Sequence, residues 1–238
     1  MAQGSGQSLH SFDLAQTGSW DFLAGVDEAG RGAWAGPVVA GAVLVSREFY
    51  QSRAGRASIG FVNDSKQLSP GARERAFEEI NQLCASGAIW GASGCASVDE
   101  IAENNILGAT GLAMQRAVEG LLGEYGRGEV AFLADGDGLL ARSTPGAPTV
   151  RLLIDGRPLK RFPYLHTGVI KGDGLSLAIA MASIVAKVTR DRMMQELDCE
   201  YPTFGFSRHK GYGTAAHLRA LRNEGPCPVH RLGFLRKL

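Results

Sequence analysis

The sequence predicts a mixed α/β fold with one central sheet. Two observations support this class. Three short apolar runs with strand character come early in the chain, and helical and strand-like segments then alternate until the chain ends in helices. The composition suits such a fold, because 45% of the 238 residues are hydrophobic and can form a core.

Five runs are short, apolar and bounded by turn residues, as expected of buried strands. They cover residues 20–26, 37–45, 88–95, 130–134 and 150–154. The first two are separated by EAGRGAWAG, whose glycines predict a turn or tight loop. A polar loop is expected over residues 46–60.

Helices are predicted from caps and helical spacing. Ser69 and Pro70 give a cap residue with proline at the first helical position, and the SVDE segment from Ser97 is a capping box. The helix that follows SVDE is expected to break near Asn105 and to end at about residue 122. A long helix is expected over 175–198 and a short one over 215–223.

The chain divides into three parts. Residues 1–19 lack the basic and apolar regions of a signal peptide and are expected to form a disordered tail. Residues 20–200 contain every predicted strand, and residues 201–238 form a helical C-terminal segment. That segment is basic, which suggests a polyanionic partner, although a solvated basic face is the simpler alternative.

Composition and motifs exclude several classes. Four cysteines form no CxxC pair, which argues against a zinc site or a disulfide framework and fits buried thiols in a reducing cytoplasm. No apolar run is long enough to cross a bilayer, so we expect a cytoplasmic protein without a membrane partner. The fingerprints of serine hydrolases, P-loop proteins, zinc peptidases and dinucleotide-binding proteins are missing from the sequence.

Acidic residues follow three of the apolar runs. They are Asp27 and Glu28 in GVDEAG, Asp155 in LIDG and Asp173 in IKGD. Carboxylates at converging strand ends, with no paired base, indicate a site for hard metal cations. Asp27 and Glu28 repel each other, and a nearby cation would relieve that repulsion. Taken alone, each acid also fits a solvated strand end or the start of a helix.

Several other residues are candidates for contact with a phosphate or sugar. They are Gly30, Arg31, Gly32, Lys66, Lys171 and Tyr212. The GRG turn combines close backbone approach with a forked donor, and an exposed hairpin turn is its ordinary explanation. Tyr212 lies among basic residues in HKGYGTAAH, which suits stacking beside phosphate contacts. Lys66 precedes a capped helix and could equally belong to a simple loop.

Together these segments resemble bacterial ribonuclease HII, the type 2 ribonuclease H. The matching stretches occur in family order from about residue 23 to 225: AGVDEAGRGAWAGPVVAGAVL, NDSKQLS, ENNILGATGLAMQRAV, LLIDG, VIKGD, ASIVAKVTRDRMM and YPTFGFSRHKGYGTAAH. Each motif is weak alone, whereas the ordered set is highly specific.

The resemblance implies a ribonuclease H-like fold, with a mixed five-stranded sheet flanked by helices and a small C-terminal helical part. Residues 20–200 would be the catalytic domain and residues 201–238 a substrate-binding segment. The implied activity is endonucleolytic hydrolysis of RNA in RNA–DNA hybrids, and nicking 5′ to single ribonucleotides embedded in duplex DNA. A monomer that removes ribonucleotides from DNA and leaves 5′-phosphate ends is expected.

The resemblance also implies the roles of the candidate residues. It places the metal ligands at Asp27, Glu28, Asp155 and Asp173. Their four negative charges would be balanced by two Mg²⁺ or Mn²⁺ ions. The GRG turn and Tyr212 correspond to the elements that sense the RNA–DNA junction, and Lys66 and Lys171 would add salt-dependent affinity.

The third carboxylate has two candidates. LADG contains Asp135 and LIDG contains Asp155. The short distance between the MQRAV helix and the DG strand in the family favours Asp135, whereas the length of the segment up to KGD, with Pro163, favours Asp155. We expect Asp155 to be the ligand, with an extra loop inserted before its strand. Gly174, where the family more often has Ala or Ser, is a smaller departure.

Three other classes fit parts of the pattern. Another two-metal nuclease on the same fold, such as a resolvase-like enzyme, would cut branched DNA that contains no ribonucleotide. A binding module without activity would have lost the acids, which are all present. A calcium-stabilised structural protein could use DGDG at 135–138, but the remaining ligands of a calcium loop are missing from the sequence.

Overall fold

The structure is a computed structural model, and it describes residues 5–53, 55, 62, 68–126, 130–133 and 146–235. Within these residues the side chains of 5–8 and 131–133 are not described. The predictions for Lys66 and Asp135 therefore lie outside the described residues.

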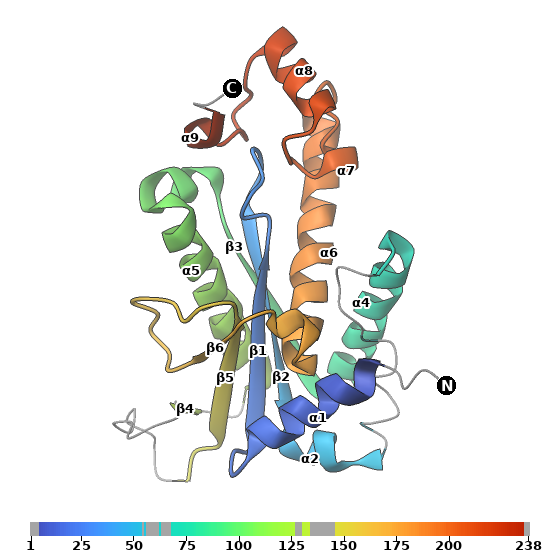
Figure 1. Cartoon of the computed structure of the whole chain (residues 1–238), viewed down its shortest axis with the longest axis vertical. Coiled ribbons are helices and arrows are strands. Elements are labelled where there is room, and N and C mark those ends of the chain that lie inside the picture. Colours follow the sequence, from blue (N-terminus) through green and yellow to red (C-terminus); the bar gives the residue numbers. More distant parts are fainter. Residues whose placement is uncertain are drawn as a thin grey trace.

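The described part of the chain contains a six-stranded sheet, five of whose strands run in the order β3-β2-β1-β5-β4 (Figure 1). The strands are β1 (Phe22–Ala29), β2 (Val38–Ser46), β3 (Ile89–Ala96), β4 (Ala131–Leu133), β5 (Thr149–Asp155) and β6 (Thr167–Val169). β1 pairs antiparallel with β2 and parallel with β5, so the sheet is mixed. The predicted mixed sheet of five strands is confirmed, and the short β6 extends the β4 edge beside the end of β5.

Helices cover both faces of this sheet, as predicted. The helical elements are α1 (Ser5–Thr17), α2 (Arg47–Gln51), α4 (Pro70–Ala85), α5 (Val98–Tyr125), η1 (Gly172–Gly174), α6 (Leu177–Glu200), α7 (Phe206–His209), α8 (Ala215–Glu224) and α9 (Leu232–Leu235). The side chains of Ser69 and Ser97 cap α4 and α5. The predicted break lies at Asn105, which has a positive φ of 56°.

The two faces of β2 bury different helices. Val43 and Val45 belong to the core that contains α6, whereas Ala42 and Leu44 belong to the core that contains α5. Alternate residues of a strand point to opposite faces, so each face contributes to one core. Figure 1 shows α5 on one side of the sheet and α6 with α4 on the other. Burial on both faces explains why β2 is a continuous apolar run in the sequence.

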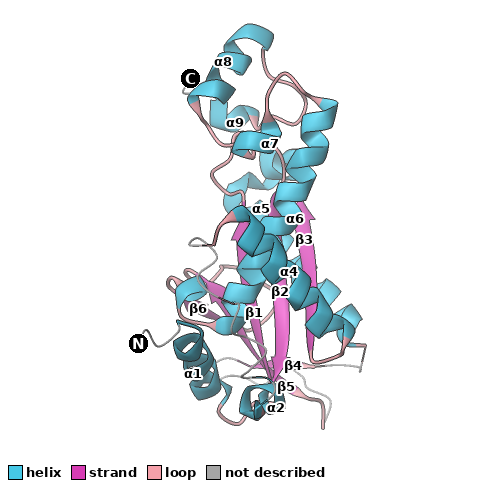
Figure 2. Cartoon of the chain, turned by 90° about the vertical axis from the view of Figure 1, so that its right-hand side faces the viewer, coloured by secondary structure: helices cyan, strands magenta, loops and turns pink. Residues whose placement is uncertain are grey.

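The C-terminal elements form a small third core beyond the end of the sheet. Figure 2 shows α6 continuing past the strands to the end of the molecule where α7, α8 and α9 gather. Ala35, Met194, Phe204 and Phe206 are buried together in this core. The connection between β1 and β2 is therefore packed against the C-terminal segment, and both meet at one end of the sheet.

The prediction of a disordered tail over residues 1–19 is wrong for the described part of that range. Helix α1 packs on the same core as α6, with Leu9 buried. Buried Asp13 accepts hydrogen bonds from the Tyr50 hydroxyl and from the Ala178 backbone, at 2.8 and 2.9 Å. A carboxylate at the N-terminus of α6 is favoured by the helix dipole, which helps to fix α1 in place.

The loop predicted over 46–60 also begins differently, because α2 occupies its first residues and Ser46 caps it. The four cysteines are free thiols, and Cys95 and Cys199 are exposed, not buried as expected. Among the helices that the structure describes, none is long and apolar enough to span a bilayer.

Candidate active site

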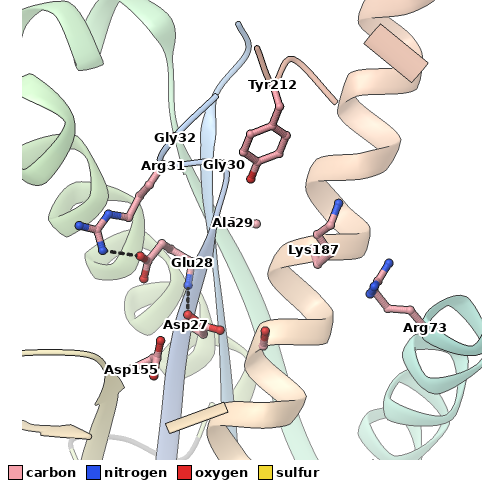
Figure 3. Close-up of a pocket in the computed structure, with 11 residues that line it drawn as sticks. Asp27, Glu28, Ala29, Gly30, Arg31, Gly32, Arg73, Asp155, Lys187 and Tyr212 are labelled. Atoms are coloured by element: carbon pink, nitrogen blue, oxygen red, sulfur yellow. Dashed lines mark hydrogen bonds and ion pairs between the residues drawn. The ribbon is translucent and has the colours of Figure 1, made fainter. Parts of the chain in front are cut away.

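A pocket of about 340 Å³ opens at the end of the sheet where β1 and β5 finish (Figure 3). It is lined by Asp27, Glu28, Ala29, Gly30, Arg31, Gly32, Arg73, Asp155, Ser183, Lys187 and Tyr212. These residues come from five separate segments of the chain, so the fold, and not local sequence, assembles the pocket.

The register of the parallel strands brings the acids together. β1 and β5 pair from Phe22 with Val150 as far as Val26 with Ile154. Asp27 and Asp155 are the next residues on the two strands, and the carboxyl ends of parallel neighbours lie at the same edge of a sheet. Glu28 is the last residue but one of β1, and Ala29 separates it from the GRG turn.

Each of the three carboxylates also contacts a donor of the protein. The Glu28 N–H donates to Asp27 Oδ1 at 2.7 Å, and Arg31 Nη1 donates to Glu28 Oε1 at 2.8 Å. The Gly172 N–H donates to Asp155 Oδ1 at 2.6 Å. These contacts hold the acids in defined positions around the pocket.

The electrostatics of the acids indicate a deficit of positive charge. Burial raises the pKa of Asp27 well above its usual value, the negative charges of Glu28 and Asp155 raise it further, and a hydrogen bond with Ser183 opposes this shift. Burial also raises the pKa of Glu28, although Arg31 lowers it, and the charge of Asp155 again adds to it. A divalent cation would remove this repulsion.

The donor set fits a hard cation. Three carboxylates supply only oxygen ligands, which Mg²⁺ and Mn²⁺ prefer. Among the residues that the structure describes, no three His, Cys, Asp or Glu side chains are already arranged as metal ligands. The three carboxylates are bound by the N–H and guanidinium donors named above, and they are the residues that would hold a cation bound in this pocket.

Asp173 and Lys171 lie beside the pocket, not in its lining. Asp173 is only 2% exposed and lies in η1, directly after the Gly172 amide that binds Asp155. Lys171 is exposed and has a positive φ of 57°. The structure thus connects the KGD turn to the pocket through the hydrogen bond from the Gly172 amide to Asp155.

The opposite wall of the pocket is basic. Figure 3 shows Lys187 on α6 and Arg73 on α4 across the pocket from Glu28 and Asp155. Lys187 forms an ion pair with Asp191 one turn further along α6, and Arg73 Nη2 donates to the Leu68 carbonyl at 2.9 Å. A phosphate in the pocket would therefore lie between cationic side chains and the acidic strand ends.

The GRG turn and Tyr212 face each other at the top of the pocket (Figure 3). Gly30 has a positive φ of 91°, and a Cβ there would lie 1.9 Å from Arg190 Nε, so only glycine fits. A Cβ on Gly32 would lie 4.0 Å from the Tyr212 ring. Tyr212 is 39% exposed, and the Arg190 guanidinium lies 5.6 Å from the centroid of its ring.

Sequence reasoning assigned no role to Arg73, Ser183 or Lys187, which also line the pocket. Ser183 and Lys187 are four residues apart on α6 and share a helix face, so their spacing was a usable signal. Arg73 is placed only by the packing of α4 against α6, which the sequence pattern does not reveal.

Comparison with curated proteins gives a consistent result. The ribonuclease HII family model matches residues 24–130 and 156–237. Ribonuclease HII of Caulobacter vibrioides (strain NA1000 / CB15N) is 45% identical over 212 residues, which are 89% of this chain and 83% of that protein. Ribonuclease HII of Ruminiclostridium cellulolyticum is 40% identical over 233 residues, which are 97% of this chain and 76% of that protein.

Solved structures show the same fold. RNase HII in its complex with PCNA from Archaeoglobus fulgidus has a TM-score of 0.61 at 21% identity, over 89% of this chain and 94% of that chain. The ribonuclease H2 of Pyrococcus horikoshii OT3 has a TM-score of 0.57 at 24% identity, over 91% and 96%. Bst-RNase HIII in complex with Mn²⁺ has a TM-score of 0.57 at 20% identity, over 89% and 65%.

The solved structures show that the fold is that of the ribonuclease H class. The family match adds that the protein is a metal-dependent nuclease, and acids lie at the ends of the central strands of its sheet. Within that class, this chain belongs to the ribonuclease HII family. It is an endoribonuclease that hydrolyses the RNA strand of RNA–DNA hybrids and depends on divalent metal ions. Asp135 and Asp155 both lie between the two matched segments, so the family match favours neither as the third carboxylate.

Proposed function

We propose that this enzyme also nicks duplex DNA on the 5′ side of a single embedded ribonucleotide, using two divalent cations. The proposed ligands are Asp27, Glu28, Asp155 and Asp173. The observation that carries this proposal is the make-up of one pocket, in which carboxylates, the GRG turn and an exposed tyrosine meet. Such a pocket combines ligands for hard cations with groups that can contact a ribose.

The acids have different surroundings, which suggests their roles. Bound cations would activate a water molecule and stabilise charge on the phosphate and on the leaving oxygen. Asp27 is buried and feels the charge of both Glu28 and Asp155, so it is proposed as the shared ligand. Asp173 completes the set because the Gly172 amide, next to it in the chain, is anchored to Asp155.

The GRG turn and Tyr212 are proposed to distinguish RNA from DNA. The 2′-hydroxyl of a ribose is both a donor and an acceptor, and backbone groups of an exposed turn can read it. Arg31 and Gly32 are exposed beside the pocket, and Tyr212 faces them. The Tyr212 ring would stack on the sugar that follows the ribonucleotide and hold the scissile phosphate near the acids.

Cationic groups would bind the strand on either side of the cut. Lys187 and Arg73 face the acids across the pocket and are proposed to contact phosphates. The predicted contacts of Lys66 and Lys171 stay predictions, and Lys66 lies outside the described residues. The monomeric state and the cytoplasmic location also stay predictions from the sequence.

Three labelled substrates test this proposal. They are a DNA duplex with one ribonucleotide, the same duplex without it, and a four-way DNA junction, each with Mg²⁺, Mn²⁺ or EDTA. We expect metal-dependent cutting of the first alone, on the 5′ side of the ribonucleotide. Cutting of the junction would favour a resolvase-like enzyme. Hydrolysis of a continuous RNA–DNA hybrid without any cutting of the first substrate would overturn the proposed nicking activity.

A further inference from the structure

Two buried arginines from distant parts of the chain hold the loop that carries the GRG turn. This β1–β2 loop covers residues 30–37. Arg231 follows α8 and is 2% exposed, and Arg190 lies on α6 and is fully buried. Both guanidinium groups point into the loop and bind its backbone.

Arg231 gathers the carbonyls of the GRG turn. Its Nη1 donates to the Gly30, Ala33 and Arg31 carbonyls at 2.8, 2.9 and 3.1 Å, and its Nε donates to the Gly36 carbonyl at 2.8 Å. The Arg231 backbone N–H also donates to the Trp34 carbonyl, at 2.7 Å. One residue thus fixes both ends and the middle of the loop.

Arg190 binds the remainder of the loop and connects it to the segment that contains Tyr212. Its Nε and Nη2 donate to the Pro37 and Ala35 carbonyls at 2.9 and 3.1 Å. Its Nη1 donates to the Lys210 carbonyl at 2.9 Å. Among the loop carbonyls, only that of Gly32 is not bound by one of these two residues.

Burying two guanidinium groups to bind loop carbonyls costs folding free energy. A buried guanidinium loses its hydration, and these hydrogen bonds are made to neutral carbonyls and not to a carboxylate that would balance the charge. Several carbonyls of the loop depend on these two side chains for a donor, and a buried carbonyl without a donor costs stability. The buried guanidinium groups therefore set the conformation of the loop as well as satisfying its backbone.

The direction of the carbonyls determines the direction of the amides. In a trans peptide the C=O and the following N–H point in opposite directions, and the described chain has no cis peptide. Since the Gly30 and Arg31 carbonyls turn toward Arg231, the N–H groups of Arg31 and Gly32 turn away from it. Both residues are exposed and line the pocket, and no acceptor in the described chain takes either N–H.

We propose that Arg231 is a positioning residue for the GRG turn, which aims two backbone donors of that turn into the pocket. The inference rests on the proposed role of the GRG turn in reading the ribose. It adds a residue about 200 positions away in sequence, as the separations of 201 and 200 residues to Gly30 and Arg31 show. Arg231 contacts no substrate and acts through the loop.

The test compares Arg231→Met with a matched control, Arg151→Met. Arg151 is also a buried arginine, 8% exposed, and lies on β5 four residues before Asp155, near Trp20 and away from the GRG turn. Both variants are assayed for thermal stability, for kcat and KM on a duplex with one ribonucleotide, and by ¹⁹F NMR of fluorotryptophan-labelled protein. The Trp34 resonance reports the loop directly.

We expect Arg231→Met to lower kcat by about 10- to 100-fold with KM changed less than about threefold, because small misplacements of positioning groups have effects of that size. Its Trp34 resonance should shift or broaden while the other tryptophan resonances stay. Arg151→Met should keep kcat within about threefold of wild type at a similar loss of stability.

Wild-type kcat and an unchanged Trp34 resonance in Arg231→Met would overturn the proposal, and so would equal losses of kcat in the two variants. If Arg231→Met does not fold, Arg231→Lys tests the proposal in its place, because lysine keeps the positive charge but can bind only some of the loop carbonyls that Arg231 binds. A several-fold loss of kcat in that variant supports the proposal and wild-type kcat overturns it. Failure of the wild type to cut the ribonucleotide would instead overturn the proposed function.

Discussion

Acidification is expected to destabilise the C-terminal segment through His217. The side chain of His217 is fully buried, with Nδ1 3.0 Å from the Tyr212 carbonyl and Nε2 2.9 Å from His230 Nε2. The rings of His209 and Trp34 pack against it, at centroid distances of 4.4 and 5.6 Å. Protonation would place a charge in this enclosed site, beside two other histidines.

The size of the effect follows from the pKa. Burial lowers the pKa of His217 from 6.5 to about 4, and the charges of His209 and His230 add to the shift, while the hydrogen bond to Tyr212 opposes it. His217 therefore binds a proton near pH 6.5 in the unfolded chain but only near pH 4 in the folded chain. Stability is lost as the pH falls through this window, by about 3 kcal/mol in total.

Urea unfolding of wild type and of His217→Gln, at steps between pH 7 and about pH 4.5, measures this contribution. Tryptophan fluorescence follows unfolding, and Trp34, whose ring packs on His217, contributes to it. The difference between the two proteins removes the effects of distant titrating groups, such as Asp13, whose pKa burial raises to about 6, and it measures His217 together with its direct neighbour His230. Wild type should lose stability more steeply than the variant, and parallel curves would refute this reasoning.

Two further predictions concern the substrate contacts. Tyr212→Ala should lower the rate of cleavage at a single ribonucleotide by about 10- to 100-fold, which corresponds to the loss of one stacking contact, while binding of the hybrid changes little. Single-turnover kinetics measure the cleavage rate, and a binding titration measures the affinity. Equal losses of rate and affinity would exclude a role in sensing the junction. Arg73→Gln and Lys187→Gln should each reduce the slope of log K against log salt by about 1 if each contacts a phosphate. Binding titrations at several salt concentrations measure that slope, and an unchanged slope would exclude the contact.

The central fold was predictable because the sequence patterns that indicate its strands and helices each span only a few neighbouring residues. The apolar runs of β1, β2 and β5 and the caps of α4 and α5 each lie within a few residues of sequence. Helix α1 was missed for the opposite reason. Its sequence is mostly polar, and its order depends on Leu9 in the core and on Asp13 at the start of α6, 165 residues away. Tertiary contacts of this kind stabilise a helix that its own sequence does not predict.

The candidate site was only partly predictable. The acids and the GRG turn could be found because a strand end and a glycine turn are visible in sequence. The structure brings Asp27, Glu28 and Asp155 to one pocket but leaves Asp173 beside it. The arginines that shape the loop bind carbonyls across 153 to 201 residues, and a carbonyl acceptor has no sequence signature.

The identity of the third carboxylate decides whether this pocket is the catalytic centre. Asp155 lines the pocket and raises the pKa of Asp27, whereas Asp135 lies outside the described residues. Cleavage of a duplex with one ribonucleotide is measured with Mg²⁺ and with EDTA for wild type, Asp155→Asn and Asp135→Asn. Metal-dependent cutting that is lost in Asp155→Asn and retained in Asp135→Asn is expected. Loss in Asp135→Asn with full activity in Asp155→Asn would move the third ligand to the earlier segment and remove Asp155 from the site.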